Sequence, residues 1–200
     1  MTEALATRYD KAAPLWGDKV RALGYFDAYL GFLSALPPSP VEMALDAGCG
    51  TGAFAEALAT VAPPAHGIVL LDPSEGMLRK AQAAVEARGA GTRTVRATLG
   101  ARPGPVDLVL AAHVIEHCPD PAEALADLRA MLRPGGRLYL VLSKPHWCNA
   151  IIWLQWRHRT FGRGEAVRFL RGVGFEVVAE HRFPVGPPSR TSRGWVARAV

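Results

Sequence analysis

The sequence is poor in cysteine and has no long apolar stretch. Its three cysteines, Cys49, Cys118 and Cys148, are scattered and show neither CxxC spacing nor clustering with histidine. This argues against a disulfide scaffold and a structural zinc site, so we expect no metal. No apolar run reaches the ~18 residues that a membrane span requires, and residues 1–10 lack the basic-then-apolar pattern of a signal peptide. These absences favour a reducing, cytoplasmic setting.

The charge is positive but dispersed. Lys and Arg number 23 against 18 Asp and Glu, which gives a net charge of +5 and an isoelectric point near 9.4. A basic domain can bind nucleic acid or an anionic membrane. The arginines here are spread along the chain and form no block or nucleic-acid motif. We therefore expect no nucleic-acid partner, whereas peripheral contact with a membrane remains an open alternative.

The 200 residues suit a single domain, 1–200, with three segments. Residues 1–40 show helical patterning rich in aromatic side chains and end in a Pro-Pro-Ser-Pro connector. In 41–143, short apolar runs alternate with amphipathic stretches of helical length. The predicted strands are 41–46, 67–72, 92–97, 106–112 and 137–143, and the predicted helices are 53–61, 74–88 and 121–133.

This alternation predicts the fold class α/β, a three-layer sandwich. The run 106–112 lacks polar alternation, as expected for a strand that helices cover on both faces. Strands that alternate with helices form a parallel sheet with right-handed crossovers. The last segment, 144–200, adds a helix at 164–172 and two apolar runs, 175–183 and 194–200, which we expect to pair as an antiparallel hairpin.

A glycine-rich loop, Leu-Asp-Ala-Gly-Cys-Gly-Thr-Gly at 45–52, is the strongest local motif. It follows a predicted strand and opens a predicted helix, whose N-terminus favours a carboxylate or phosphate. Asp46 can accept hydrogen bonds from loop amides or from a ligand ammonium. Asp72 ends the next strand, 20 residues after Gly52, where an acid can accept both hydroxyls of a ribose. The pattern indicates a nucleoside-bearing cofactor.

The spacing GxGxG, preceded by an acid, differs from the GxGxxG of dinucleotide-binding loops. At this point the sequence resembles the class I methyltransferases that use S-adenosylmethionine, in particular the small-molecule, methyltransferase-type-11 group. The resemblance continues through 70–78, 106–125 and 132–141. It implies a Rossmann-like, mostly parallel seven-stranded sheet with an antiparallel last strand, and an N-terminal helical lid over 1–40. It also implies methyl transfer to an O, N or S atom of a small organic acceptor; a nicotinamide enzyme is the weaker alternative.

The resemblance also implies the cofactor-binding residues. The amino-acid end of the cofactor would be lined by Asp46, Gly48, Gly50 and Gly52. Its ribose would be held by Asp72, and its adenine would pack against Pro73 and Met77. Relatives often carry a Gly-Asp pair after the third strand, whereas residues 96–100 read Arg-Ala-Thr-Leu-Gly here. The adenine contact is therefore left unassigned.

Two residues are candidates for a catalytic role. His113 ends the fourth strand and would orient or deprotonate the acceptor; the alternative is a loop histidine with a satisfied hydrogen bond. Tyr9 lies in the segment that relatives use as a lid, and would face the cofactor or pack within the helix. We expect a structural role for Glu116 and its neighbour His117, with a place in the cofactor environment as the alternative. Trp16 and Tyr25 are expected in the core rather than in a pocket.

The segment 144–159 concentrates tryptophan, histidine and arginine after the fifth strand. Three interpretations are open for this segment. In the first it caps the acceptor pocket, with His146, Trp147 and Arg157 as substrate-binding candidates. In the second it lies on a membrane surface, and in the third it forms a packed helix with a basic end. The second interpretation goes with a lipid-like acceptor, such as a quinone precursor or a phospholipid amine. A non-catalytic cofactor-binding domain is a third hypothesis. The sequence does not indicate the oligomeric state.

Overall fold

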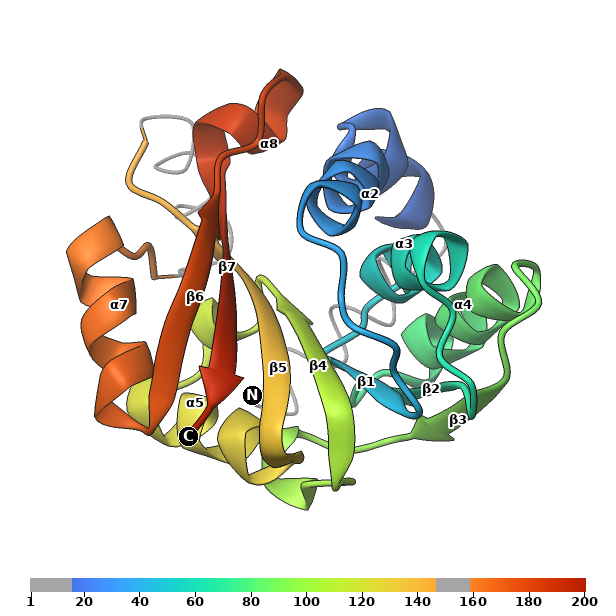
Figure 1. The fold of residues 1–200 in the computed structure, drawn as a ribbon. Coiled ribbons are helices and arrows are strands. Elements are labelled where there is room, and N and C mark those ends of the chain that lie inside the picture. The colour runs from blue at the N-terminus through green and yellow to red at the C-terminus, as the bar shows by residue number, and fades with distance from the viewer. Residues whose placement is uncertain (1–15, 147–158) are drawn as a thin grey trace.

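The computed structural model describes residues 16–146 and 159–200. Within them, seven strands form one sheet in the order β3-β2-β1-β4-β5-β7-β6 (Figure 1). In chain order the strands are β1 (Ala44–Ala47), β2 (Ile68–Leu71), β3 (Thr92–Val95), β4 (Val106–Ala112), β5 (Leu132–Ser143), β6 (Phe175–His181) and β7 (Ser192–Ala199).

The direction of the strands confirms the predicted sheet. β1 pairs in parallel with β2 and β4, and the parallel pairing continues outward to β3 and β5. β7 runs antiparallel to both β5 and β6, as the hairpin and the family resemblance predict. The strand order reverses at β1 and β4, and in such sheets ligands bind in the crevice outside the carboxyl ends of the strands at this reversal.

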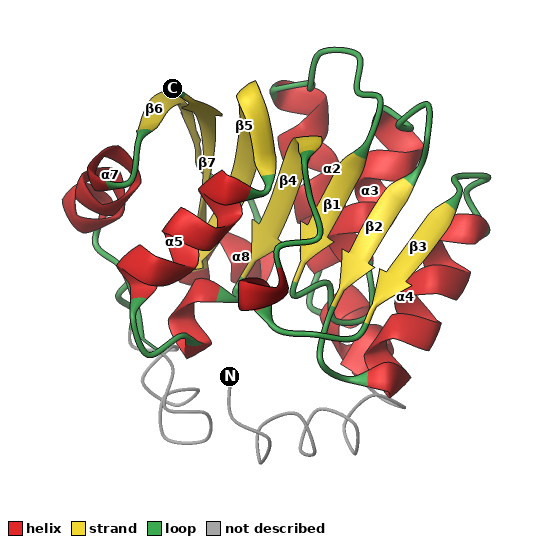
Figure 2. Ribbon diagram, turned by 90° about the horizontal axis from the view of Figure 1, so that it is seen from below, coloured by secondary structure: helices red, strands yellow, loops and turns green. Residues whose placement is uncertain are grey.

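Helices cover both faces of the sheet, which makes three layers (Figure 2). α2 (Tyr25–Ala35), α3 (Ala53–Val61) and α4 (Glu75–Glu86) pack on one face. α5 (Pro121–Ala130) and α7 (Arg163–Gly172) pack on the other. No helix in the described ranges is both long and apolar enough to cross a membrane.

The helix α2 is fixed to the sheet by aromatic packing and one hydrogen bond. Phe32 is fully buried and lies on Gly194 of β7, where a Cβ would come within 2.9 Å of its Cε1 atom. The Tyr139 hydroxyl of β5 donates to the Leu36 carbonyl at 2.7 Å. These contacts hold α2 beside the carboxyl end of the sheet, where it forms one wall of the cavity described below.

The structure differs from the predicted elements at three places. The helix predicted over 121–133 ends at Ala130, and β5 begins at Leu132 rather than 137, because Leu132 pairs with Val106 before a register shift. The loop predicted between the last two strands contains α8 (Gly186–Thr191). Residues 16–22 are helical and are separated from α2 by Gly24, whose φ is 79°.

Candidate functional site

A cavity of about 490 Å³ opens where β1, β2 and β4 end. Most of the predicted site residues line it: Asp46, Gly48, Gly50, Asp72, Pro73, Met77 and His113. Two predicted residues, Gly52 and His146, are described but do not belong to its lining. Tyr9, Trp147 and Arg157 lie outside the described residues.

The three glycines of the loop after β1 have positive φ for different structural reasons. A Cβ on Gly48 would come within 2.5 Å of Val114 Cγ2, and one on Gly52 within 2.7 Å of the Ala81 Cα in α4. Gly50, with φ 51°, has nothing within 4 Å of an added Cβ. Gly52 therefore permits α3 and α4 to pack closely, whereas the backbone at Gly50 faces open space in the cavity and can be approached by a ligand.

Asp46 is buried at the end of β1 and reaches across to the first turn of α3. Its Oδ2 atom accepts a hydrogen bond from the Ala55 N–H at 3.1 Å. Burial raises the pKa of Asp46 to about 7; the Ala55 hydrogen bond opposes this rise and the negative charge of Asp72 adds to it. A positively charged group of a ligand would stabilise the ionised form of this buried carboxylate and lower its pKa.

Asp72, which follows β2, links the glycine loop after β1 to the start of α4. Its Oδ2 accepts from the Gly50 N–H at 3.0 Å, and its Oδ1 accepts from the Ser74 N–H at 2.9 Å. Ser74 in turn caps α4 by accepting from the Met77 N–H at 3.1 Å. A carboxylate has about four acceptor positions, and these backbone bonds fix the orientation of Asp72 at the wall of the cavity.

The stretch after β3, which sequence left unassigned, also borders the cavity. Ala97, Thr98, Leu99 and Gly100 line it, with Leu99 in the short 3-10 helix η1 (Leu99–Ala101). They face the same cavity as Pro73 and Met77, the side chains predicted to pack on adenine. No acid stands in this stretch, so its polar groups toward a ligand are backbone atoms and the Thr98 hydroxyl.

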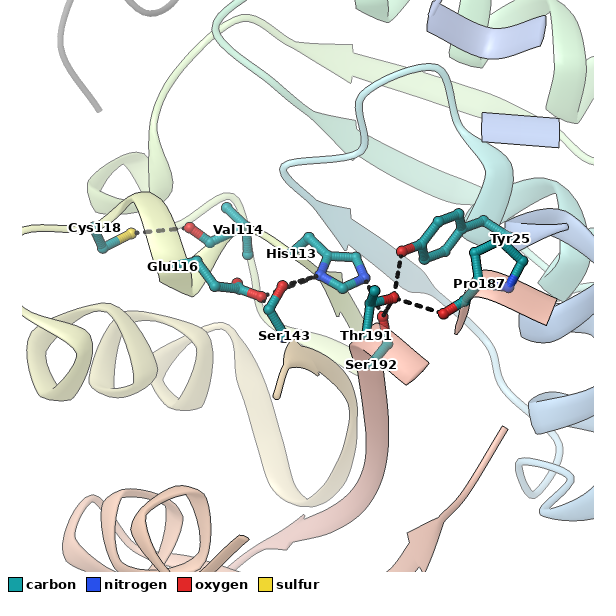
Figure 3. A network of polar contacts seen from close by, with 9 residues as sticks. All are labelled: Tyr25, His113, Val114, Glu116, Cys118, Ser143, Pro187, Thr191 and Ser192. Atoms are coloured by element: carbon teal, nitrogen blue, oxygen red, sulfur yellow. Dashed lines mark hydrogen bonds and ion pairs between the residues drawn. The ribbon is translucent and has the colours of Figure 1, made fainter. Parts of the chain in front are cut away.

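His113 follows β4, lines the cavity, and belongs to a network of polar side chains (Figure 3). Its Nδ1 atom lies 3.1 Å from Glu116 Oε1 and 3.0 Å from Ser143 Oγ. Its Nε2 atom lies 3.3 Å from Ser192 Oγ. Its backbone φ is 56°, a left-handed conformation that is uncommon for residues other than glycine. The histidine is thus held by groups from β5 and β7 as well as by its own turn.

Glu116 belongs to the 3-10 helix η2 (Ile115–His117) and has a fully buried side chain. The Ser143 N–H donates to its Oε1 at 2.6 Å, whereas no described residue donates to its Oε2. Burial tends to raise the pKa of Glu116, but the hydrogen bonds with His113 and Ser143 and the attraction of His113 outweigh it and lower the pKa below its ordinary value. The carboxylate is therefore charged at neutral pH.

The N-terminal helices also contribute to the wall of the cavity. Trp16, Lys19, Val20, Tyr25 and Tyr29 line it. The expectation that Trp16 and Tyr25 belong to the core rather than to a pocket is therefore wrong, because residues 16–22 and α2 lie over the crevice and both side chains line the cavity. Burial, reinforced by Tyr25 and the charges of Asp46 and Glu116, raises the pKa of Tyr29 well above its usual value, so its hydroxyl stays protonated.

Sequence reasoning favoured a structural role for Glu116 and did not name Ser143 or Ser192. Glu116 could have been placed near His113 from the sequence, because the two residues are three positions apart after a predicted strand. Ser143 and Ser192 are 30 and 79 residues from His113, and nothing in the sequence relates them to it. Within 16–146 and 159–200, no cluster of three or more His, Cys, Asp or Glu could hold a metal ion.

Comparison with known proteins agrees with this geometry. Residues 45–140 match the family model described as a methyltransferase domain. The glycine loop and the two strand-end acids lie within this match, which covers just under half of the chain, and the fold resembles that of class I methyltransferases whose solved structures hold S-adenosylmethionine or S-adenosylhomocysteine. The cavity fits such a cofactor, since Gly50 leaves backbone open beside two buried carboxylates.

Individual relatives are similar to the chain over only part of its length. The chain is 38% identical over 122 residues to an uncharacterized 37.1 kDa protein in transposon TN4556 of Streptomyces fradiae, covering 60% of this chain and 35% of that protein. It is 32% identical over 140 residues to the ubiquinone biosynthesis O-methyltransferase of Methylococcus capsulatus, covering 66% and 58%. The chain therefore spans less than two thirds of the length of either relative.

The fold is shared with solved structures. The 1,6-didemethyltoxoflavin-N1-methyltransferase of Burkholderia thailandensis, with 1,6-didemethyltoxoflavin and S-adenosylhomocysteine bound, superimposes with a TM-score of 0.75. The superposition covers 98% of this chain and 87% of that chain at 21% identity. At this identity the likeness concerns the fold and not the acceptor.

Proposed function

We propose that the chain transfers the methyl group of S-adenosylmethionine to an O, N or S atom of a small organic acceptor. The observation that carries this is a cavity whose lining includes Asp46, the open backbone of Gly50, Asp72 and His113. When bound, the cofactor supplies a methyl group on a positively charged sulfur, which leaves as a neutral thioether. The protein has to align the acceptor with that methyl group.

The cofactor-binding roles follow from the groups that line the cavity. Asp46 would pair with the ammonium of the cofactor, and Asp72 would accept the ribose hydroxyls. Pro73, Met77 and the stretch 97–100 would enclose the adenine. Tyr25 and Tyr29 also line the cavity, and aromatic faces there would favour a sulfonium through cation–π contacts of ~0.5–2 kcal/mol.

Calorimetric titration with S-adenosylmethionine, S-adenosylhomocysteine and NAD, each alone, tests this proposal. We expect micromolar affinity for both sulfur nucleosides, about 8 kcal/mol of binding free energy, and none for NAD. Binding of NAD alone would refute the cofactor assignment. Cofactor binding without methyl transfer to any acceptor would instead favour a non-catalytic cofactor-binding domain.

A lipid-like acceptor at a membrane surface is a second candidate. It is supported by the name of the ubiquinone biosynthesis relative and by the apolar and aromatic side chains of Trp16, Val20 and Leu23 along the cavity. Binding to anionic liposomes that weakens with salt would favour it, because charge attraction to such a surface is screened by ions. Absence of binding at low salt would leave a water-soluble acceptor.

A reducing, cytoplasmic setting is part of the same proposal. Cys49 is buried and Cys118 half-buried, and both have free thiols. Free thiols are typical of proteins kept in a reducing compartment. Mass spectrometry of the protein isolated under alkylating conditions would show both cysteines alkylated after unfolding, and a disulfide on either would contradict this setting.

A further inference from the structure

The helical residues 16–22 and the turn after them form one wall of the cavity. The side chains of this wall are Trp16, Lys19, Val20 and Leu23. Their spacing of three and four positions places them on one side of a helix. Gly24 then separates this segment from α2, with a φ of 79° and nothing within 4 Å of an added Cβ. The wall is therefore joined to α2 through a residue whose backbone is free of packing contacts on that side.

The other side of the segment 16–22 rests on the glycine loop and on α3. An added Cβ on Gly17 would lie 3.5 Å from Thr51 Oγ1 in the glycine loop. Arg21, four positions later, donates from Nη2 to Glu56 Oε2 in α3 at 2.6 Å. Its guanidinium also lies over the Phe26 ring, with Cζ 4.3 Å from the ring centroid. This ion pair ties the segment to the helix that begins directly after the glycine loop.

Glu56 has a second partner that does not belong to this segment. The Glu56 side chain is only 7% exposed, and its Oε1 accepts from Nε and Nη2 of Arg88 at 3.2 and 2.9 Å. Arg88 follows α4, which packs on the sheet. A buried carboxylate that loses all its partners is strongly destabilising. Arg88 therefore keeps Glu56 paired when Arg21, which is 53% exposed, moves away into water.

We propose that Arg21 and Glu56 form a latch that can open and that Arg88 is the permanent partner which makes its opening possible. Opening turns the segment 16–22 about Gly24 and uncovers the glycine loop, so the latch sets the rate at which the cofactor leaves. This inference rests on the proposed function, which puts the cofactor in the cavity.

The latch gives the two arginines on one carboxylate opposite effects. Without Arg21, nothing but packing holds the segment, and it should open more often. Without Arg88, opening would leave the buried Glu56 carboxylate unpaired, and the segment should open less often. A network that served only to stabilise the fold would behave differently, because removal of either arginine would then loosen the segment.

Hydrogen exchange of the cofactor-free protein tests the latch itself. Exchange of the backbone amides of residues 16–24, followed by mass spectrometry, should be faster than wild type in Arg21→Gln and slower in Arg88→Gln. Arg133→Gln is the matched control. Arg133 is 48% exposed and pairs with Asp107 at the amino end of β4, and neither residue lines the cavity. This variant should leave exchange in 16–24 unchanged.

Stopped-flow tryptophan fluorescence with S-adenosylhomocysteine tests cofactor release and needs no acceptor. Trp16 lines the cavity and so reports its occupation. The dissociation rate constant should rise about three- to tenfold in Arg21→Gln and in Glu56→Gln. It should fall at least about twofold in Arg88→Gln. Arg133→Gln should match the wild type.

Salt offers a test of the wild-type protein. Because Arg21 is half-exposed, added salt screens its attraction to Glu56. The wild-type dissociation rate constant should therefore rise when NaCl is raised by about an order of magnitude, and Arg21→Gln should lose this rise.

Several outcomes would overturn the inference. These are changes in the same direction in Arg21→Gln and Arg88→Gln, equal dissociation rates in Arg21→Gln and Arg133→Gln, or wild-type dissociation that does not respond to salt. If Arg88→Gln does not fold, Arg21→Gln and the salt series still decide. Calorimetry separates the two levels. Binding of S-adenosylhomocysteine with unchanged dissociation rates removes only this inference, whereas absence of binding removes the proposed function and the latch's role with it.

Discussion

At the cofactor end of the cavity, backbone N–H groups and two carboxylates come from a continuous stretch of chain between Asp46 and Asp72. At the acceptor end, His113 is surrounded by side chains from α2, β5, β7 and its own turn. The first arrangement depends on local backbone conformation, and the second on packing between distant elements. Substitutions at the cofactor end should therefore act through loop geometry and charge, and those at the acceptor end through the orientation of one ring.

The largest effect expected at the cofactor end is the destabilisation caused by Gly52→Ala. The new Cβ would lie 2.7 Å from the Ala81 Cα at a φ of 84°, so overpacking and left-handed strain together should lower the free energy of unfolding by ~2–4 kcal/mol. The matched variant Gly50→Ala has open space and should cost only ~1 kcal/mol, while weakening cofactor binding. Urea unfolding and calorimetry of both variants test this, and equal destabilisation would contradict the separate roles.

The next largest effect is expected for Asp72→Ala. Its carboxylate is placed to accept the ribose hydroxyls while it binds the N–H groups of Gly50 and Ser74, so its removal should weaken cofactor affinity by ~1–3 kcal/mol. Glu75→Ala removes the same charge from an exposed position on α4 and should have little effect. Similar affinities of the two variants would refute the ribose assignment.

Asp46 should make cofactor binding depend on pH. Because its pKa is about 7 in the folded protein, the fraction of charged carboxylate falls with pH below 7, and affinity should fall by up to tenfold for each unit. Asp46→Asn keeps an oxygen for the Ala55 N–H and should bind weakly with a flat profile near pH 7. Calorimetry between pH 6 and 8 would show this, and a wild-type profile without slope would exclude the ammonium pairing.

The same shift predicts an opposite effect on stability. The pKa of Asp46 is raised from 3.8 to about 7, so the folded protein binds this proton more tightly than the unfolded chain, and stability falls as pH rises from about 4 to 7. The cofactor-free Asp46→Asn variant should therefore have a higher Tm than the wild type at pH 8, with the difference disappearing near pH 4. A lower Tm at pH 8 would contradict the raised pKa.

The smallest effect is expected where α2 is attached to the sheet. Tyr139→Phe removes the hydrogen bond to the Leu36 carbonyl and should lower the free energy of unfolding by about 1 kcal/mol. Cofactor affinity should stay unchanged, because Tyr139 does not line the cavity. A large loss of affinity in this variant would show that the wall formed by α2 is coupled to the cofactor end.

Much of the fold was predictable from the chain because its signals are local. The apolar runs at 106–112 and 67–72 and the helical periodicity between them depend on neighbouring residues, and the structure confirms these elements as β4 and, over Ile68–Leu71, β2. The antiparallel hairpin of β6 and β7 also followed from two runs separated by a polar loop. The early start of β5 was missed, since it depends on pairing between Leu132 and Val106, which no periodicity within the segment reveals.

The cofactor end was determined by sequence for the same reason. Glycines at 48, 50 and 52 and acids at the ends of β1 and β2 follow one another over a short distance, so spacing alone predicted that Asp46, Gly50 and Asp72 share a site. Only the tertiary structure decided which glycine faces the cavity and which permits helix packing, because Gly50 and Gly52 both have positive φ and differ in what a Cβ would meet.

The acceptor end was decided by the tertiary structure. His113 was recognisable as a candidate, but its partners Ser143 and Ser192 reach it only when β5 and β7 lie side by side in the sheet. Burial by this packing leaves the Glu116 carboxylate little contact with water, and His113 and Ser143 then hold its charge. Sequence specifies such residues but not their burial, and burial is the physical reason that a serine, a glutamate and a histidine from separate elements form one site.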